Sequence, residues 1–316
     1  MDVSKITIRD VSAEWLGMKK LSVKESTYSK YYCIVKRQII PELGEVPLEK
    51  VNSSLINSFT GRKLGRNQEE DSRVLGNKTV RDINMVLKSI IRYGEREYHM
   101  AHLAENTVLP KPKRESIETL TADELDRVSR YLWKHETDAR YIGLLLCMYS
   151  GMRLGEICAL RWKDIDLQEQ VIYINHTLQR IPIPDENSIK RTRIIIDVPK
   201  TSSSMRVIPI SGQIYPSIKN LRGKAGGTDF FLTSSSKFME PRNYQYFFKR
   251  ILRKSEVRNV NFHILRHTFA TRCVEVGMDV KTLSEILGHS NINITLNYYV
   301  HSSMESKKKQ INLLML

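Results

Sequence analysis

The chain has little cysteine, and its four cysteines are far apart in the sequence. Cys33, Cys147, Cys158 and Cys273 form no C-x-x-C pair, so the sequence predicts neither a disulfide framework nor a cysteine zinc site. We expect buried, free thiols in a protein of a reducing cytoplasm.

Long hydrophobic runs are also missing. No run approaches the roughly 18 apolar residues of a membrane-spanning helix, and the N-terminus lacks the apolar core of a signal peptide. We therefore predict no membrane partner. With only 15 glycines and 10 prolines among 316 residues, the composition is that of a folded globular chain, long enough for two domains.

Acidic clusters and zinc motifs are absent as well. His263 and His267 are spaced i, i+4, so they share a helix face, as zinc-binding histidines often do. However, Ile264 follows His263, so the His-Glu-x-x-His motif of metalloproteases is missing. We predict no metal site and no cofactor, and give His267 a structural role.

Basic residues are in excess. The chain has 50 Lys and Arg against 35 Asp and Glu, a formal net charge of +15. Such an excess favours a polyanionic partner, most often nucleic acid. Charge alone indicates a DNA-binding protein, and it does not indicate any catalytic activity.

Residues 1–109 are predicted to form a helical DNA-binding domain. We expect a helix at 27–40 ended by Pro41, a shorter one at 48–59 capped by Asn52 or Ser53, and a long amphipathic one at 79–98. Basic residues border the last helix and are predicted to contact DNA phosphates. They are Lys78, Arg81, Lys88 and Arg92.

Residues 110–116 are predicted to be a linker, because Pro110 and Pro112 disfavour a helix. Its basic residues suit a strap along a phosphate backbone. They are Lys111, Lys113 and Arg114. The following sequence, Thr121-Ala122-Asp123-Glu124, is a capping box, so we begin a second domain, residues 117–302, just before it.

The second domain is predicted to combine helices with a β-rich section. The run 141–148 is apolar on all sides and predicts a buried helix that breaks at Gly151. Strands are expected at 171–178, 194–198 and 206–210, with Lys200 at the turn between the last two. Residues 181–193 read as a hairpin or insertion. A helix at 242–254 carries further expected DNA contacts, Arg242, Lys249 and Arg250.

Residues 262–301 are predicted to form three short helices. Gly277 and Gly288 would end the first two in left-handed caps, and Asp279 and Ser290 would be the N-caps of the next two. This segment concentrates residues that suit phosphate chemistry. They are His263, Arg266, His289, Tyr298 and Tyr299.

The order of these motifs resembles that of the tyrosine recombinases, the phage-integrase and Xer-like family, over nearly the whole chain. Residues 152–157, with Arg153 and Glu156, resemble the first arginine box of the family. Residues 199–210, with Lys200, resemble its hairpin lysine and the S-x-R-x-I-P strand. Residues 263–270 resemble the second box, and 287–301 the third.

The resemblance implies a mainly α fold with a small β-sheet, in which a helical core-binding domain and a catalytic domain form a C-shaped clamp on DNA. It implies a metal- and ATP-independent strand transferase that works through a 3′-phosphotyrosyl intermediate and a Holliday junction. Arg153 and Arg266 would offer planar, forked donors to the phosphate oxygens, with Glu156 as a brace for Arg153.

The resemblance also implies roles for the other site residues. His263 and His289 would hold phosphate oxygens and help to remove the tyrosine proton, and Lys200 would protonate the departing 5′-oxygen. Tyr298 and Tyr299 compete for the role of nucleophile, because adjacent helix positions point about 100° apart. We assign Tyr299, which we expect on an inward face with Ile292 and Leu296, and keep Tyr298 as the alternative.

The implied partners are double-stranded recombination sites, three further copies of the chain on DNA, and accessory DNA-bending or directionality factors. We expect a bacterial, phage or mobile-element source and a role in integrating or excising such an element. The alternatives are Xer-like dimer resolution, a type IB topoisomerase-like activity and non-catalytic DNA binding. The tail, residues 303–316, turns from basic to apolar; we expect it to dock onto a neighbouring protomer, with packing on its own domain as the alternative.

Overall fold

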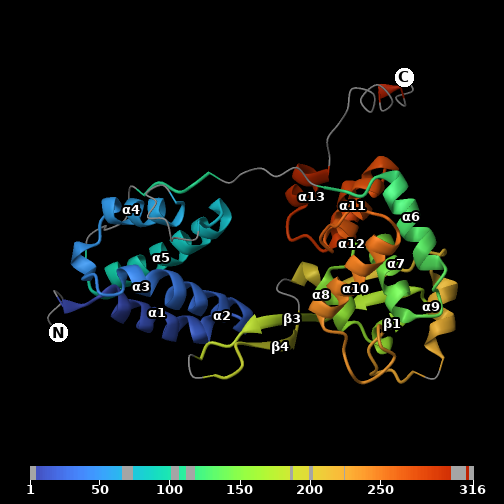
Figure 1. The fold of residues 1–316 in the computed structure, drawn as a ribbon, viewed down its shortest axis with the longest axis horizontal. Coiled ribbons are helices and arrows are strands. Elements are labelled where there is room, and N and C mark those ends of the chain that lie inside the picture. Colours follow the sequence, from blue (N-terminus) through green and yellow to red (C-terminus); the bar gives the residue numbers. More distant parts are fainter. Residues whose placement is uncertain are drawn as a thin grey trace. The chain divides into compact units, whose positions relative to one another are not determined.

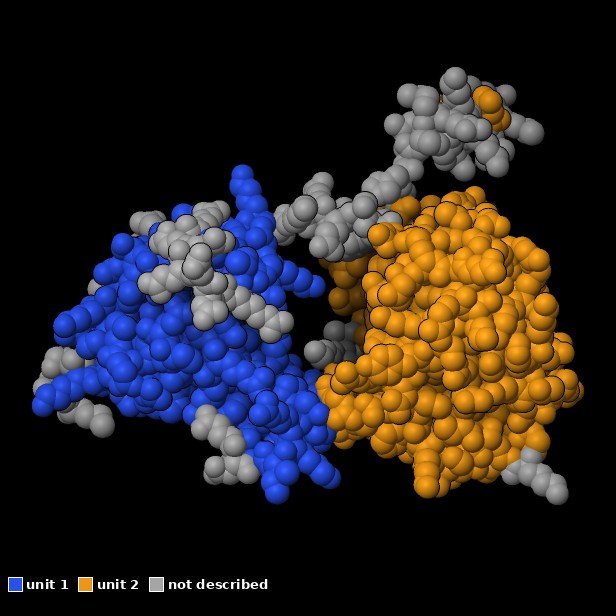
Figure 2. Space-filling view, in the orientation of Figure 1, with its two compact units in different colours: residues 1–115, 181–193 blue, residues 116–180, 194–316 orange. Residues whose placement is uncertain are grey.

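In the computed structural model the chain divides into two compact units (Figures 1 and 2). Unit 1 comprises Met1–Glu115 and Ile181–Arg193, and unit 2 comprises Ser116–Arg180 and Ile194–Leu316. The structure describes residues 5–65, 74–100, 107–111, 118–185, 188–198, 202–223, 225–299 and 311–312. Helices dominate both units and the strands are short, which confirms the predicted fold class.

Unit 1 is built of helices around one core. Its elements are α1 (Ile8–Ser22), α2 (Glu25–Ile34), η2 (Val35–Ile39), α3 (Ile40–Leu43), η3 (Leu48–Lys50), α4 (Ser53–Lys63) and α5 (Asn77–Glu97). The apolar stripe of α5 is buried, with Val80, Ile83, Leu87 and Ile90 at 0% exposure. Trp15 of α1 packs in the same core, and its indole N–H donates to Ser89 Oγ at 3.2 Å.

Pro41 does not end the second helix, contrary to the prediction. The wider turn η2 leads from α2 into α3, and Pro41 stands in the first turn of α3. The chain before Pro41 is itself helical, since the N–H of Ile40 donates to the carbonyl of Val35, so the proline removes one hydrogen bond from a continuous helix. A π-type turn also changes the backbone path just before the ring. Asn52 is the cap of α4, since its Oδ1 accepts from the N–H of Leu55 at 2.9 Å.

The beginning of the predicted linker lies against α5. Arg81 Nη1 donates to the carbonyl of Pro110 at 3.0 Å, and Asn77 Nδ2 donates to that of Lys111 at 3.1 Å. The guanidinium of Arg81 is therefore partly engaged within the unit. Lys113 and Arg114 lie outside the described residues.

Unit 2 has a larger, mixed core. Its helices are α6 (Ala122–Trp133), α7 (Ala139–Ser150), α8 (Leu154–Ala159), η4 (Trp162–Asp164), η5 (Ser202–Ser204), α9 (Tyr215–Arg222), α10 (Pro241–Lys254), α11 (Ile264–Glu275), α12 (Val280–Leu287) and α13 (Ile292–Tyr299). The capping box of Thr121 and Glu124 starts α6, as predicted. Helix α7 is the central helix, with Ile142, Leu144 and Leu145 at 0% exposure.

The strands form two small sheets. They are β1 (Ile165–Asp166), β2 (Val171–Ile174), β3 (Thr177–Pro182), β4 (Thr192–Asp197) and β5 (Arg206–Pro209). An antiparallel sheet has the order β1-β2-β5, and β3 pairs with β4. The predicted hairpin at 181–193 is therefore present. The strands β4 and β5 lie on either side of Lys200 in the sequence, as expected, but they belong to different sheets, and Lys200 itself lies outside the described residues.

The last three helices follow the glycine pattern of the sequence. Gly277 and Gly288 have φ of +85° and +65°, as the prediction of left-handed caps requires. Asp279 caps α12 by accepting from the N–H of Thr282 at 2.8 Å. The predicted cap Ser290 is wrong: Asn291 precedes α13, and its Oδ1 accepts from the N–H of Asn293 at 2.8 Å.

Two further predictions concern the state of the cysteines and the presence of membrane-spanning helices. Cys147, Cys158 and Cys273 are free and buried, and Cys33 is free and half-buried. In the described part of the chain no helix is long and apolar enough to cross a membrane.

Candidate active site

Arg153 stands at the start of α8, directly after a sharp turn at the end of α7. Gly151 ends α7 in a left-handed conformation, with φ of +63°. From there Arg153 Nη1 donates to Glu156 Oε1 at 2.7 Å, and Nη2 donates to the carbonyl of Gly288 at 3.1 Å. Its side chain is one-third exposed, so the guanidinium is braced on one edge and open to a ligand. Glu156 is the brace that the sequence predicted.

Arg266 is the buried arginine of the site, with 2% exposure. Its Nη1 donates to the carbonyl of Gly151 at 2.9 Å, and its Nη2 donates to that of Leu287 at 2.7 Å. Burial, together with the nearby charge of Arg153, lowers the pKa of Arg266 to about 9. The group is still a cation at neutral pH, held by backbone carbonyls rather than by a carboxylate.

His263 and His289 border these two arginines and are both predominantly neutral at pH 7. His289 is half-buried, and Nδ1 lies 2.8 Å from Thr295 Oγ1. Burial and then the charge of Arg266 lower the pKa of His289 to about 4. His263 reaches solvent, yet desolvation by the surrounding protein, followed by His267 and Arg266, lowers its pKa as well. Burial, and after it repulsion by the neighbouring cations, explains why both rings are mainly neutral, and an approaching anion would relieve the repulsion.

Tyr299 lies inside the cluster that joins the last three helices. It is 7% exposed and packs with Ala270, Cys273, Leu283 and Leu287. Its hydroxyl lies 2.7 Å from Nδ1 of His267. His267, to which the sequence assigned a structural role, thus contacts the candidate nucleophile directly. Nothing is described of the side chain of Tyr298.

The inward face of α13 differs from the predicted one. Ile292 and Leu296 are 41% and 38% exposed, whereas Thr295 is fully buried at 0%. Thr295 and Tyr299 are spaced i, i+4, so they share the buried face. The face turns because Thr295 bonds to His289 and Tyr299 to His267, and these polar contacts decide the rotation of so short a helix.

Arg206 is a site-adjacent residue that the sequence reasoning did not single out. Its side chain is 5% exposed, and its two terminal nitrogens donate to the two oxygens of Glu156 at 3.0 and 2.9 Å. The strand pattern contained a signal: Arg206 and Ile208 are spaced i, i+2 on β5, so they point to the same face. Ile208 is 1% exposed, and an arginine beside it needs a buried partner.

The remaining predicted residues are placed as follows. Lys200 lies outside the described residues. The predicted DNA-contacting side chains of α10 are exposed, and Arg250 lies over the ring of Phe247 at 5.2 Å. On α5 and the linker, Lys78, Arg92 and Lys111 are exposed, and Arg81 and Lys88 are half-buried. Among the described residues, no group of three or more His, Cys, Asp or Glu could hold a metal ion.

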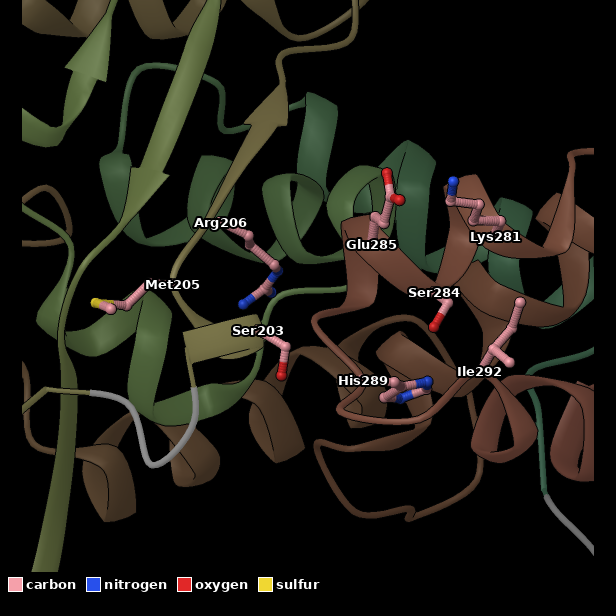
Figure 3. A pocket seen from close by; sticks show the side chains of 8 residues that line it. All are labelled: Ser203, Met205, Arg206, Lys281, Ser284, Glu285, His289 and Ile292. Carbon is pink, nitrogen blue, oxygen red and sulfur yellow. The ribbon is translucent and has the colours of Figure 1, made fainter.

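A small cavity opens beside the site (Figure 3). Its volume is about 360 Å³, and its walls come from the segment before β5, from α12 and from the start of α13. The lining residues are Ser203, Met205, Arg206, Lys281, Ser284, Glu285, His289 and Ile292. His289 therefore lines this cavity and also contacts Thr295.

Two family models match the chain. The model described as "Phage integrase family" matches residues 118–306, and "Phage integrase, N-terminal SAM-like domain" matches residues 7–62. The "Tyrosine recombinase XerC-like" protein of Caldanaerobacter subterraneus is 28% identical over 99% of this chain and 84% of its own length. The "Transposase from transposon Tn916" of Enterococcus faecalis is 24% identical over 71% of this chain. This match covers 56% of the transposase, so just over half of that relative's length is represented.

Solved structures share the fold at low sequence identity. The Tn1549 transposon integrase in complex with a circular intermediate DNA matches with a TM-score of 0.75 and 24% identity, over 98% of this chain and 100% of that one. A lambda integrase tetramer bound to a Holliday junction matches with a TM-score of 0.65 and 18% identity, over 94% of this chain and 78% of that one. These likenesses show that the chain shares the fold of these two integrases.

Proposed function

The chain belongs to the phage integrase family, whose members are site-specific DNA recombinases, and we propose that it cuts and rejoins DNA with Tyr299 as nucleophile. The observation that carries this proposal is the holding of Arg153 and Arg266 by the carbonyls of Gly288 and Leu287, two adjacent residues. Two guanidiniums fixed on one turn form a preorganised basin for a phosphate whose charge grows in the transition state.

The proposed reaction exchanges one phosphate ester for another. The oxygen of Tyr299 attacks phosphorus while its proton passes to a neighbouring histidine, the bond from phosphorus to the 5′-oxygen breaks, and a 3′-phosphotyrosyl link forms. Lys200 gives a proton to the departing 5′-oxygen. Arg153, Arg266, His263 and His289 donate to the non-bridging oxygens. The bond energy is kept in the phosphotyrosine, so the reaction needs neither ATP nor a metal ion.

Strand exchange follows when the freed 5′-hydroxyl of a second duplex attacks the phosphotyrosyl bond. We assign this to four copies of the chain on two recombination sites, through a Holliday junction, with residues 303–316 docking between protomers. The helical domain 1–109 and the catalytic domain 117–302, joined by residues 110–116, would close as a clamp on the duplex. We further propose that the chain acts in the cytoplasm and that DNA-bending or directionality factors assist it.

The biological role that we favour is integration and excision of a mobile element. It is supported by the likeness to the Tn916 transposase and the Tn1549 integrase. The second candidate is Xer-like resolution of chromosome dimers, favoured by the XerC-like relative. Recombination between two unlike attachment sites to give hybrid products would support the first, and recombination restricted to two copies of one symmetric site would support the second.

Trapping of the covalent intermediate tests the reaction. In a duplex nicked a few nucleotides beyond the scissile phosphate, cleavage releases the short fragment that carries the new 5′-hydroxyl. Without this hydroxyl the strand cannot be rejoined, so the phosphotyrosyl complex accumulates. We expect the chain to form this complex in the presence of EDTA, and Tyr299→Phe to form none while still binding the duplex. Tyr298→Phe is the matched control and should retain the complex.

Mass spectrometry of the trapped peptide then identifies the linked residue. A DNA-linked Tyr298 would overturn the assignment of the nucleophile. A chain that binds the duplex without ever linking to it would be a non-catalytic DNA-binding protein. Relaxation of supercoils by a monomer, without joining of two duplexes, would instead indicate a topoisomerase-like enzyme.

A further inference from the structure

Arg206 has more fixed partners than either arginine that we assign to the phosphate. It begins β5, and its side chain is 5% exposed. Nη1 and Nη2 donate to the two oxygens of Glu156, Nε donates to the carbonyl of Ile286 at 2.5 Å, and Nη1 also reaches the carbonyl of Ser204 at 3.2 Å. Four of the five N–H donors of this guanidinium therefore bond within the protein.

Glu156 connects Arg206 with Arg153. Its Oε1 accepts from Arg153 Nη1 at 2.7 Å and from Arg206 Nη1 at 3.0 Å, and its Oε2 accepts from the N–H of Arg153 and from Arg206 Nη2, both at 2.9 Å. Glu156 is 3% exposed. The carboxylate has no freedom to rotate while both guanidiniums hold it, so it presents a fixed edge to Arg153.

The second connection runs through the C-terminal end of α12. The carbonyls of three consecutive residues, Ile286, Leu287 and Gly288, accept from Arg206, Arg266 and Arg153 respectively. A helix C-terminus carries partial negative charge, which suits three cations. His289 follows this turn directly, and Figure 3 shows it beside the same cavity that Arg206 lines. Arg206 thus ties the strand β5 to the turn that orients both arginines and His289.

We propose that Arg206 is a positioning residue for DNA cleavage: through Glu156 and the end of α12 it fixes the orientation of Arg153 and His289. This rests on the proposed function, because its effect is on the same phosphate-binding groups. It does not require Arg206 to touch DNA. Arg206 also lies six residues after Lys200 in the sequence, so it anchors the strand that follows the proposed general acid.

The electrostatics give this role a measurable signature. Burial alone would raise the pKa of Glu156, but the hydrogen bonds and charge of Arg206, followed by the charge of Arg153, lower it to about 2. Without Arg206 the buried carboxylate keeps one cationic partner, so its pKa must rise. Protonated Glu156 would no longer hold Arg153 as an ion pair, and cleavage would fall on the acid side at a higher pH than in the parent chain.

The test compares Arg206→Met and Arg206→Lys with the parent chain. The duplex affinity and the single-turnover rate of covalent complex formation are measured between pH 5 and 8 at saturating protein. We expect Arg206→Met to lower the rate at pH 7 by about 100-fold with affinity changed less than about threefold, and its acid limb to move to higher pH. Arg206→Lys should be intermediate, because one ammonium cannot span both carboxylate oxygens.

Arg258→Met is the matched control. Arg258 likewise bonds to carboxylate and carbonyl oxygens, those of Glu118, Glu124 and Thr119, away from the site. Its loss therefore reports on fold stability alone and should leave the rate and the pH profile within about threefold of the parent. Circular dichroism verifies folding, and if Arg206→Met does not fold, Arg206→Lys decides. A folded Arg206 variant with the parent's rate and acid limb would overturn the proposal. Failure of the parent chain to link to DNA would instead overturn the proposed function.

Discussion

At the scale of single residues, the most direct contact of the candidate nucleophile is with His267. The hydroxyl of Tyr299 lies 2.7 Å from Nδ1 of His267, so the phenol donates to this nitrogen when the imidazole carries its proton on Nε2. Burial and then the charge of Arg266 lower the pKa of His267, which favours the neutral, accepting form at neutral pH. The contact therefore orients the hydroxyl and offers its proton an acceptor.

Replacing His267 by phenylalanine removes that acceptor and keeps an aromatic ring in the packed site. We expect His267→Phe to slow covalent complex formation by about tenfold or more, with duplex affinity unchanged, because the phenol loses the group that orients it. His135→Phe is the control, since His135 also makes a ring contact, stacked on Tyr141 at 4.4 Å, elsewhere in unit 2. Cleavage by His267→Phe at or above the parent rate would show that the hydrogen bond only restrains Tyr299.

At the scale of elements, helix caps formed by residues close in the sequence were predicted, whereas side-chain pairs distant in the sequence were not. The capping box that starts α6 and the Asn52 cap of α4 each depend on residues three positions apart, so the sequence alone carries them. The pair Glu156 and Arg206 is separated by 50 positions, and His267 and Tyr299 by 32. No periodicity encodes such pairs, and the rotation of α13 depends on one of them.

The turn after α12 gives a test at the same scale, because two glycines with positive φ differ in the space around them. Gly288 and Gly277 both have positive φ, so alanine is strained at either position. A Cβ on Gly288 would lie 2.9 Å from Arg206 Cδ and from the carbonyl oxygen of Ser203, whereas one on Gly277 would meet nothing within 4 Å.

Both alanine variants should therefore lose about 1 kcal/mol of stability from backbone strain, measured by chemical denaturation. Only Gly288→Ala should also lose cleavage, by about tenfold or more, because the added methyl displaces Arg206 and the carbonyls that hold the arginines. Equal cleavage by the two variants would mean that the turn tolerates displacement and that its carbonyls do not orient the site.

At the scale of the whole molecule, the two units have separate hydrophobic cores, and exposed basic residues lie on both units. The core of unit 1 contains Trp15 and Leu87, that of unit 2 contains Leu145 and Trp162, and the two share no residue. Each core can therefore support its own exposed basic face, one along α5 and one along α10. Mutations on such independent faces are expected to act additively.

The salt dependence of DNA binding tests whether both faces contact phosphates. Lys78 and Arg92 are exposed on α5, and Lys249 and Arg250 on α10. The slope of log affinity against log salt is negative, and each lost phosphate contact lowers its magnitude by about 0.9. Changing either pair to glutamine should therefore lower the magnitude of the slope by about 2, and changing all four by about 4.

Arg130→Gln is the control for loss of charge alone, because Arg130 is 68% exposed but paired with Asp126, and it should leave the slope unchanged. Anisotropy titrations of one labelled duplex at several salt concentrations give all the slopes under identical conditions. A slope insensitive to the α5 pair but reduced by the α10 pair would confine the phosphate contacts of these four residues to unit 2. The opposite pattern would confine them to unit 1, and either result would contradict the proposal that both domains close on the duplex through these faces.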